Sequence, residues 1–151
     1  MPRKMSSERE REFHELSAYL GFYATCVWGI DPTAPTHPIK TLERIVEDFG
    51  RSRALEGLRQ AANDTIEDAA RFSPPEIEAL DSKCRSSGVV TVSEVRRRYS
   101  ASFRRIVKHG RIRNDTEYYL VKGITVDSAS VISQVERETL QRLLEMYEAR
   151  S

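Results

Sequence analysis

The chain has 151 residues, a net charge of +1 and two cysteines, Cys26 and Cys84. This length fits one domain, and neither cysteine has a Cys or His beside it at zinc spacing, which excludes a zinc finger and a disulfide-rich scaffold. The charged N-terminal residues and the interrupted apolar run at 20–30 predict neither a signal peptide nor a membrane span. We therefore expect a cytoplasmic protein with a single helical domain over residues 1–151.

Four Ser/Thr-x-x-Glu sequences predict helix starts, because the hydroxyl can cap the amide three residues on while the carboxylate reaches back. Each is followed by apolar residues at helical spacing, which strengthens the prediction. The four pairs are Ser7–Glu10, Ser73–Glu76, Thr91–Glu94 and Ser133–Glu136.

The first half of the sequence predicts four helices, because apolar residues recur there every three or four positions along four segments. The proline-rich segment 31–38 separates the first two, and glycines or capping residues bound the others. The predicted helices cover about 8–28, 39–49, 52–71 and 74–87.

The second half predicts two more helices and a hairpin. Apolar steps of constant phase predict one helix over about 93–109. The turn signal Asn114-Asp115, followed by the aromatic and β-branched run 118–121, predicts two short strands. The predicted fold class is mainly α, a single domain of about six helices with one small β-hairpin (about 111–122) before a C-terminal helix at 134–149.

The most unusual charge pattern lies at 96–122, where nine Lys and Arg residues stand against two carboxylates. This segment carries +7 in a chain whose net charge is +1. In the predicted helix at 93–109 the apolar residues share one face, so most of the cations lie on the opposite, outer face. The candidate binding residues are Arg97, Arg98, Arg104, Arg105, Lys108, Arg111, Arg113 and Tyr118.

A face of this charge requires a counter-charge, which could come from acidic helices of the same fold or from a partner. Arginine is favoured at protein interfaces because its planar fork pairs with carboxylates and stacks on aromatic rings. We therefore expect a non-enzymatic protein-interaction or regulatory protein, of the inhibitor, immunity or assembly-subunit type. Its expected partner is an acidic protein, or a second copy of the chain through self-association.

The alternative function is that of a DNA- or RNA-binding regulator using the same face. Thr91–Val95, leading on to Gly110–Ile112, resembles the end of a winged helix–turn–helix, in which a basic helix enters the groove and a hairpin forms the wing. This resemblance implies a nucleic-acid partner. The unbroken apolar phase from Val95 to Val107 favours one helix over the two that the motif requires.

Signals for catalysis are missing from the sequence. His14, His37 and His109 have no partner at a spacing typical of a base, a triad or a metal pair. Tyr118 and Lys122 have the spacing seen in short-chain dehydrogenases, but without the glycine-rich loop that accompanies it there. We expect no enzymatic activity, no metal, no cofactor and no membrane partner.

Overall fold

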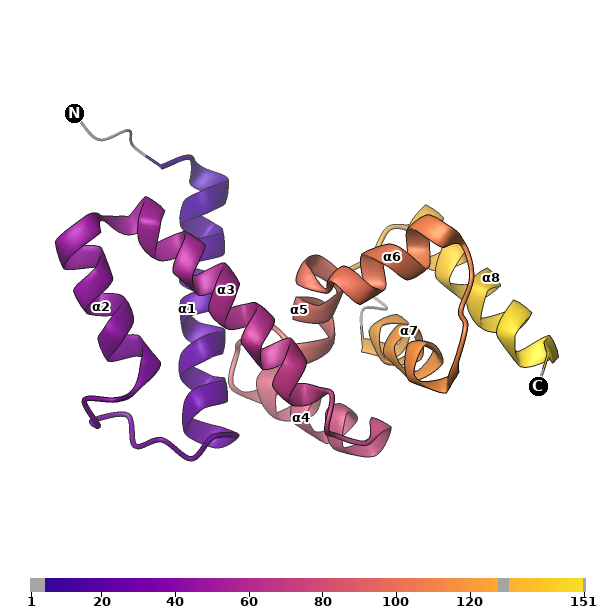
Figure 1. Cartoon of the computed structure of the whole chain (residues 1–151), viewed down its shortest axis with the longest axis horizontal. Helices are drawn as coiled ribbons and strands as arrows, with labels where there is room; N and C mark the ends of the chain where they lie inside the picture. The colour runs from indigo at the N-terminus through magenta and orange to yellow at the C-terminus, as the bar shows by residue number, and fades with distance from the viewer. Residues whose placement is uncertain (1–4, 128–130, 151) are drawn as a thin grey trace. The chain divides into compact units, whose positions relative to one another are not determined.

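The computed structural model describes residues 5–127 and 131–150, and every regular element in those ranges is a helix (Figure 1). The helical character that the sequence indicated is confirmed. The predicted fold of about six helices with a β-hairpin is wrong, because the described residues form eight helices and no sheet. The helices are α1 (Ser7–Cys26), α2 (Pro38–Phe49), α3 (Arg51–Ala69), α4 (Pro74–Ser86), α5 (Val92–Tyr99), α6 (Ala101–His109), α7 (Asp115–Asp127) and α8 (Gln134–Arg150).

The helices group into two compact units. One is built from the chain up to Asp68 together with Cys84–Val90, and the other from Ala69–Lys83 together with the chain from Thr91 onward. The expectation of one domain over residues 1–151 stays a prediction, and each unit is described by itself.

The first unit is centred on α1, whose inner face is aromatic. Tyr19 and Tyr23 are fully buried, and their hydroxyls reach α3. The Tyr19 hydroxyl lies 2.8 Å from Thr65 Oγ1, and the Tyr23 hydroxyl donates to Asp68 at 2.7 Å. Trp28 Nε1 also donates to Asp68 at 3.1 Å. Burying a polar atom destabilises the fold unless the atom has a hydrogen-bond partner, so these bonds fix which parts of α1 and α3 lie opposite each other.

The helix starts agree with three of the four predicted capping pairs. Ser73 and Glu76 form the reciprocal box, and the Ser133 hydroxyl accepts from the Glu136 amide. Thr91 accepts from the amide of Glu94. The prediction of Ser7 as the first cap is wrong, because Ser6 caps α1 by accepting from the Arg9 amide at 3.2 Å.

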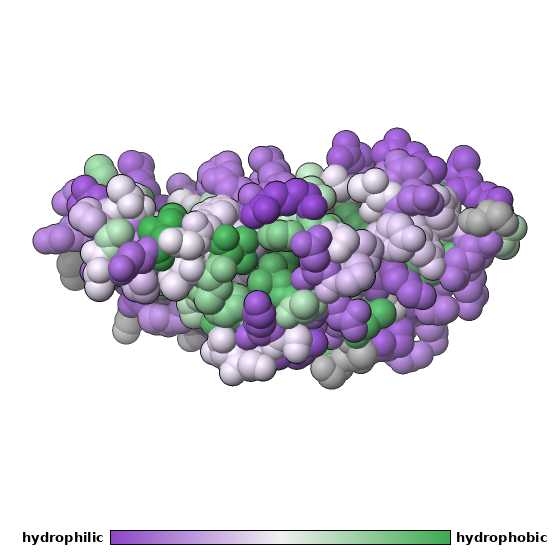
Figure 2. Space-filling model, turned by 90° about the horizontal axis from the view of Figure 1, so that it is seen from below, coloured by the Kyte–Doolittle hydropathy of each residue, from purple (hydrophilic) through white to green (hydrophobic). Residues whose placement is uncertain are grey.

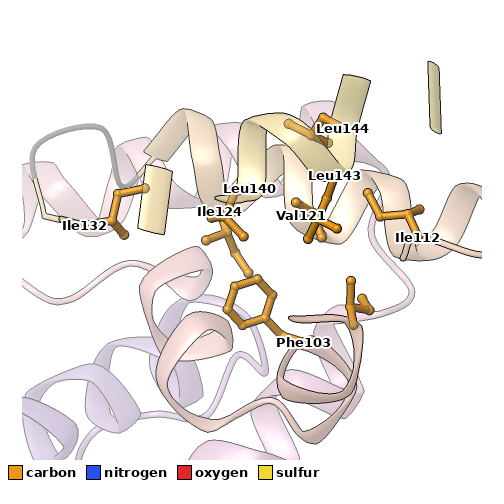
Figure 3. Packing of buried hydrophobic residues seen from close by; sticks show 9 residues of the cluster. Phe103, Ile112, Val121, Ile124, Ile132, Leu140, Leu143 and Leu144 are labelled. Atoms are coloured by element: carbon orange, nitrogen blue, oxygen red, sulfur yellow. The ribbon is translucent and has the colours of Figure 1, made fainter. Parts of the chain in front are cut away.

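The second unit has a core of aliphatic side chains and one phenylalanine, contributed mainly by α6, α7 and α8. Figure 3 shows Phe103 of α6 pointing towards Ile124 of α7, with side chains of α8 beside them. Burial of this set is the main force that holds α6 in place. The cluster comprises Phe103, Ile106, Ile112, Val121, Ile124, Ile132, Leu140, Leu143 and Leu144.

The predicted hairpin at 111–122 is replaced by a short loop and the start of α7. Asn114 acts as a helix cap rather than as a hairpin turn, since its side-chain oxygen accepts from the Glu117 amide at 2.9 Å. Within the run of strand-forming residues, Val121 is fully buried and Tyr119 is 51% exposed, which matches a helical face. Strand propensity depends strongly on context, and packing of Val121 and Ile124 into the core outweighs it here.

The predicted helix at 93–109 is two helices, joined at Ser100. This residue has extended backbone angles, φ −73° and ψ 120°, and ends α5 while it begins α6. Its hydroxyl accepts from the Phe103 amide at 3.1 Å, which satisfies one of the free amides of α6. The apolar phase hid this break, because Phe103 and Ile106 are buried on both the predicted and the observed arrangement.

Candidate functional site

Two of the three arginines of α5, Arg97 and Arg98, are neutralised inside the second unit by Glu94. The third, Arg96, is buried and donates to the Ala69 carbonyl. The Glu94 carboxylate is only 5% exposed and accepts from two successive arginines. Arg97 donates to it through Nε at 2.7 Å and Nη2 at 2.6 Å, and Arg98 donates through Nε at 2.7 Å. Arg97 Nη1 also lies 3.4 Å from an oxygen of Glu136 on α8. Two of the eight predicted binding residues are therefore ion-paired within the fold.

The pKa shifts in this cluster favour the ionised forms of Glu94 and Arg97. Burial acts to raise the pKa of Glu94, but hydrogen bonds from Arg97 and Arg98, together with their positive charges, outweigh it and lower that pKa. The hydrogen bond to Glu94 raises the pKa of Arg97 in return. The cluster holds two positive charges against Glu94 and Glu136, so it adds little net charge to the surface.

The cations of α6 have no such compensation. Arg104, Arg105 and Lys108 are exposed, and in the described part of the chain none of them lies within ion-pairing distance of a carboxylate. Arg104 Nη2 donates to the carbonyl of Tyr99 at 3.4 Å, and Arg105 Nη2 donates to the Ser102 hydroxyl at 3.3 Å. These acceptors are neutral, although the charge of Arg105 acts at longer range on Glu117 and helps to lower the pKa of that carboxyl.

The predicted residues that follow α6 also fall into two groups, an exposed cation and residues that contact a carboxylate. Arg111 is exposed and has no ion pair among the described residues. Arg113 pairs with Glu117 at 2.9 Å, and this contact lowers the pKa of the Glu117 carboxyl. The Tyr118 hydroxyl donates to Glu148 at 2.9 Å, and its ring stacks on Tyr147 with centroids 5.3 Å apart.

The structure thus leaves four of the eight predicted residues exposed and without an ion pair in the described part of the chain. We call Arg104, Arg105, Lys108 and Arg111 the α6 cationic face. Both ends of α6 are fixed, by the Ser100 cap at the start and by Gly110 in the left-handed conformation (φ 68°) at the end.

Two depressions lie beside this face, between α6 and α8. The first has a volume of about 360 Å³, a floor of Phe103, Val107 and Leu140, and a rim that includes Arg104 and Lys108. Sequence patterns placed Val107 in the core, whereas it is 39% exposed and lines this depression. Because Val107 shares a helical face with the buried Phe103, nothing in the sequence indicated that its side chain would be partly exposed.

The second depression has a volume of about 270 Å³ and is lined by residues further along α8. Its floor includes Ile112, Leu143 and Met146, and its rim includes Arg111 and Arg150. Met146 is 51% exposed. The sequence contained no indication that Met146 would lie beside the cationic residues.

The surface outside these depressions is mixed. Figure 2 shows hydrophilic side chains over much of the visible face and hydrophobic ones gathered near its middle. Large apolar side chains such as Phe49, Val131 and Val135 are also exposed. No helix within the described ranges is both long and apolar enough to cross a membrane.

The histidines do not gather into a catalytic or metal-binding arrangement. His37 is buried and caps α2, its Nδ1 accepting from the Ile39 amide at 3.2 Å while Nε2 lies 3.0 Å from the Thr25 hydroxyl. His14 is exposed and its Nε2 lies 3.0 Å from Arg51. His109 lines the second depression. Among the residues that the structure describes, no three His, Cys, Asp or Glu side chains are placed to hold a metal ion.

The site therefore consists of a rigid cationic helix face beside an apolar-floored groove. Comparison of the chain with protein-family models, with curated proteins and with solved structures found no match.

Proposed function

We propose that this chain is a non-enzymatic interaction protein that binds an acidic protein partner through the α6 cationic face. The observation that carries the proposal is the presence of four exposed cations without an ion pair among the described residues, on one short helix and its exit loop, beside two depressions with apolar floors. Arginine forks pair with carboxylates in a fixed geometry, so such a face recognises acidic side chains with direction as well as charge.

The rigidity of α6 supports this function. Phe103 and Ile106 are almost fully buried, and the two caps prevent fraying at either end. A partner therefore meets cations whose backbone is already ordered, which reduces the entropy lost on binding. Only the long side chains of the cations then lose conformational freedom on binding.

The apolar floor distinguishes a protein partner from a phosphate backbone. Interfaces between proteins combine an apolar centre with a charged rim, and arginine and methionine are enriched in them. Val107 and Met146 supply such a centre between the cations. A phosphate backbone gains nothing from contact with these side chains.

The experiment is affinity capture from a nuclease-treated lysate of the source cells. The Arg104→Glu/Arg105→Glu/Lys108→Glu variant is compared with a control of equal charge change, Lys40→Glu/Arg44→Glu/Lys122→Glu, whose three residues are exposed and lie outside the face. We expect acidic proteins to be retained by the wild type and the control, and lost by the first variant. Equal retention on all three baits would contradict the proposal.

A second candidate, nucleic-acid binding, is favoured by the break at Ser100. It turns the predicted single helix into a pair, α5 and α6, with the cations of α6 facing outward. The predicted wing is absent from the described residues, since 115–122 belong to α7. Titration with duplex DNA at rising salt tests this candidate: phosphate contacts require a steep loss of affinity with salt, weakened by Arg104→Ala plus Arg105→Ala. No binding at low salt would rule it out.

A further inference from the structure

The two depressions share no lining residue, but their α8 residues recur every three or four positions along one face of that helix, and we call the pair the α6–α8 groove. Residues from Glu136 to Leu140 of α8 line the first depression, and residues from Leu143 to Arg150 line the second. At 1.5 Å per residue, this stretch of α8 is about 20 Å long. The face of α8 that lines the two depressions therefore has the length of a helix of about four turns.

The floor of the groove is apolar and open to solvent. Val107 and Met146 are 39% and 51% exposed, although both lie beside fully buried core residues. Apolar side chains exposed in a depression with a polar rim mark an interaction site more often than scattered ones do.

Both depressions have cations among their lining residues. Arg104 and Lys108 flank the first depression, and Arg111 and Arg150 flank the second. The lining contains one carboxylate, Glu136, which already lies 3.4 Å from Arg97. An occupant therefore meets an excess of positive charge on its flanks, which selects negative charge by complementarity.

We propose that the α6–α8 groove binds an acidic amphipathic helix of a partner protein, with the helix's apolar stripe on Val107 and Met146 and its carboxylates against Arg104, Lys108 and Arg111. The proposal rests on the proposed function and names the part of the partner that is recognised. A helix is the occupant that fits, because the described residues offer no sheet edge to which an extended segment could add.

The test uses three synthetic peptides of about 15 residues, the length that matches the groove. The first is acidic, with leucines at helical i, i+3, i+4 and i+7 spacing. The second has the same composition in scrambled order, so that charge is kept and the stripe is lost. The third keeps the stripe and replaces the acids by lysines. Binding is measured by fluorescence anisotropy at low and physiological salt.

We expect the acidic striped peptide to bind about tenfold or more tightly than the scrambled one, and the basic peptide not to bind. Val107→Asp and Met146→Asp should each weaken the striped peptide about tenfold, since a buried unpaired carboxylate opposes both its leucines and its acids. Val126→Asp is the matched control, because Val126 is 59% exposed on α7 and does not line the groove. Circular dichroism and thermal melts check that all three variants fold.

The outcomes separate this inference from the proposed function. Equal binding of the striped and scrambled acidic peptides, lost on charge reversal but unchanged by Val107→Asp, overturns the groove and leaves the cationic face as the binding surface. Failure of every acidic peptide to bind also overturns the groove, and the capture experiment then decides the proposed function separately. A wild-type dimer that Val107→Asp converts to monomer identifies a second copy as occupant and overturns the inference.

Discussion

Helices α5 and α6 follow one another in the chain and carry similar numbers of basic residues, yet their charges have different fates. In α5, Arg97 and Arg98 close onto the buried Glu94. In α6, Arg104, Arg105 and Lys108 remain exposed without an ion pair among the described residues. The difference is local: α5 begins with a carboxylate three and four residues before its arginines, whereas the sequence of α6 contains none. A run of basic residues therefore predicts a charged surface only if no nearby carboxylate forms ion pairs with it.

The largest expected effect comes from removing the carboxylate that neutralises α5. Glu94→Gln leaves two arginines beside a neutral side chain that can accept fewer hydrogen bonds, so the free energy of unfolding should fall by about 3 kcal/mol. Urea denaturation measures this change. A loss below about 1 kcal/mol would show that Arg97 and Arg98 reach water without penalty, and α5 would then resemble α6.

The second prediction compares one arginine from each helix. Arg98→Gln removes a charged hydrogen bond to Glu94 and should cost about 1.5 kcal/mol of stability. Arg104→Gln should change stability by less than about 0.5 kcal/mol, because its acceptor is a neutral carbonyl at 3.4 Å. Partner binding should show the reverse order, with the larger loss at Arg104. If the same variant caused the larger loss of both stability and partner binding, the distinction between the two helices would be contradicted.

The third prediction tests the joint that separates the two helices. Ser100→Ala removes the hydroxyl that caps α6 and should cost about 1 kcal/mol. Ser102→Ala, two residues further on, removes an exposed hydroxyl and should be close to neutral. Thermal melts of the two variants are the measurement, and Ser100→Asp should restore the cap. Equal melting temperatures for Ser100→Ala and Ser102→Ala would contradict the role of Ser100 as a cap.

The smallest expected effect is on the pH dependence of stability. The pKa of Glu94 in the folded chain lies below its usual 4.5, so the folded state holds this proton less tightly than the unfolded state does. Its contribution is present above about pH 4.5 and is lost as the pH falls through the lowered pKa of the folded state. Urea unfolding between pH 7 and pH 3 should therefore decline less steeply in Glu94→Gln than in the wild type. Parallel curves would show that Glu94 titrates normally.

Sequence patterns predicted most of the helices but not the architecture around the site. Helices α1 to α4 and α8 follow from apolar spacing and caps, because both signals are local. The hairpin prediction failed because Asn and Asp are favoured in turns and at helix caps alike, and only the burial of Val121 and Ile124 decides between them. The break at Ser100 was missed because no Glu follows at the third position to complete a capping box.

Half of the candidate residues named from the sequence belong to the α6 cationic face. The sequence named Arg104, Arg105, Lys108 and Arg111 correctly as exposed cations. It also contained the spacing that pairs Glu94 with Arg97 and Arg98, which would have removed those two from the set. The groove could not be foreseen, since Val107 and Met146 come from helices far apart in the sequence, and their exposure depends on how α6 and α8 pack.

A joint of one residue at Ser100 leaves the chain no slack between the two helices. An α-helix turns by about 100° per residue, so a single insertion or deletion next to this joint would rotate the side chains of α6 by more than a quarter of a turn. After a deletion Arg104 would move towards the place of Phe103, and after an insertion Ser102 would, so that in both cases Phe103 leaves its core position. The direction in which the cations point is thus set by chain length as much as by residue type.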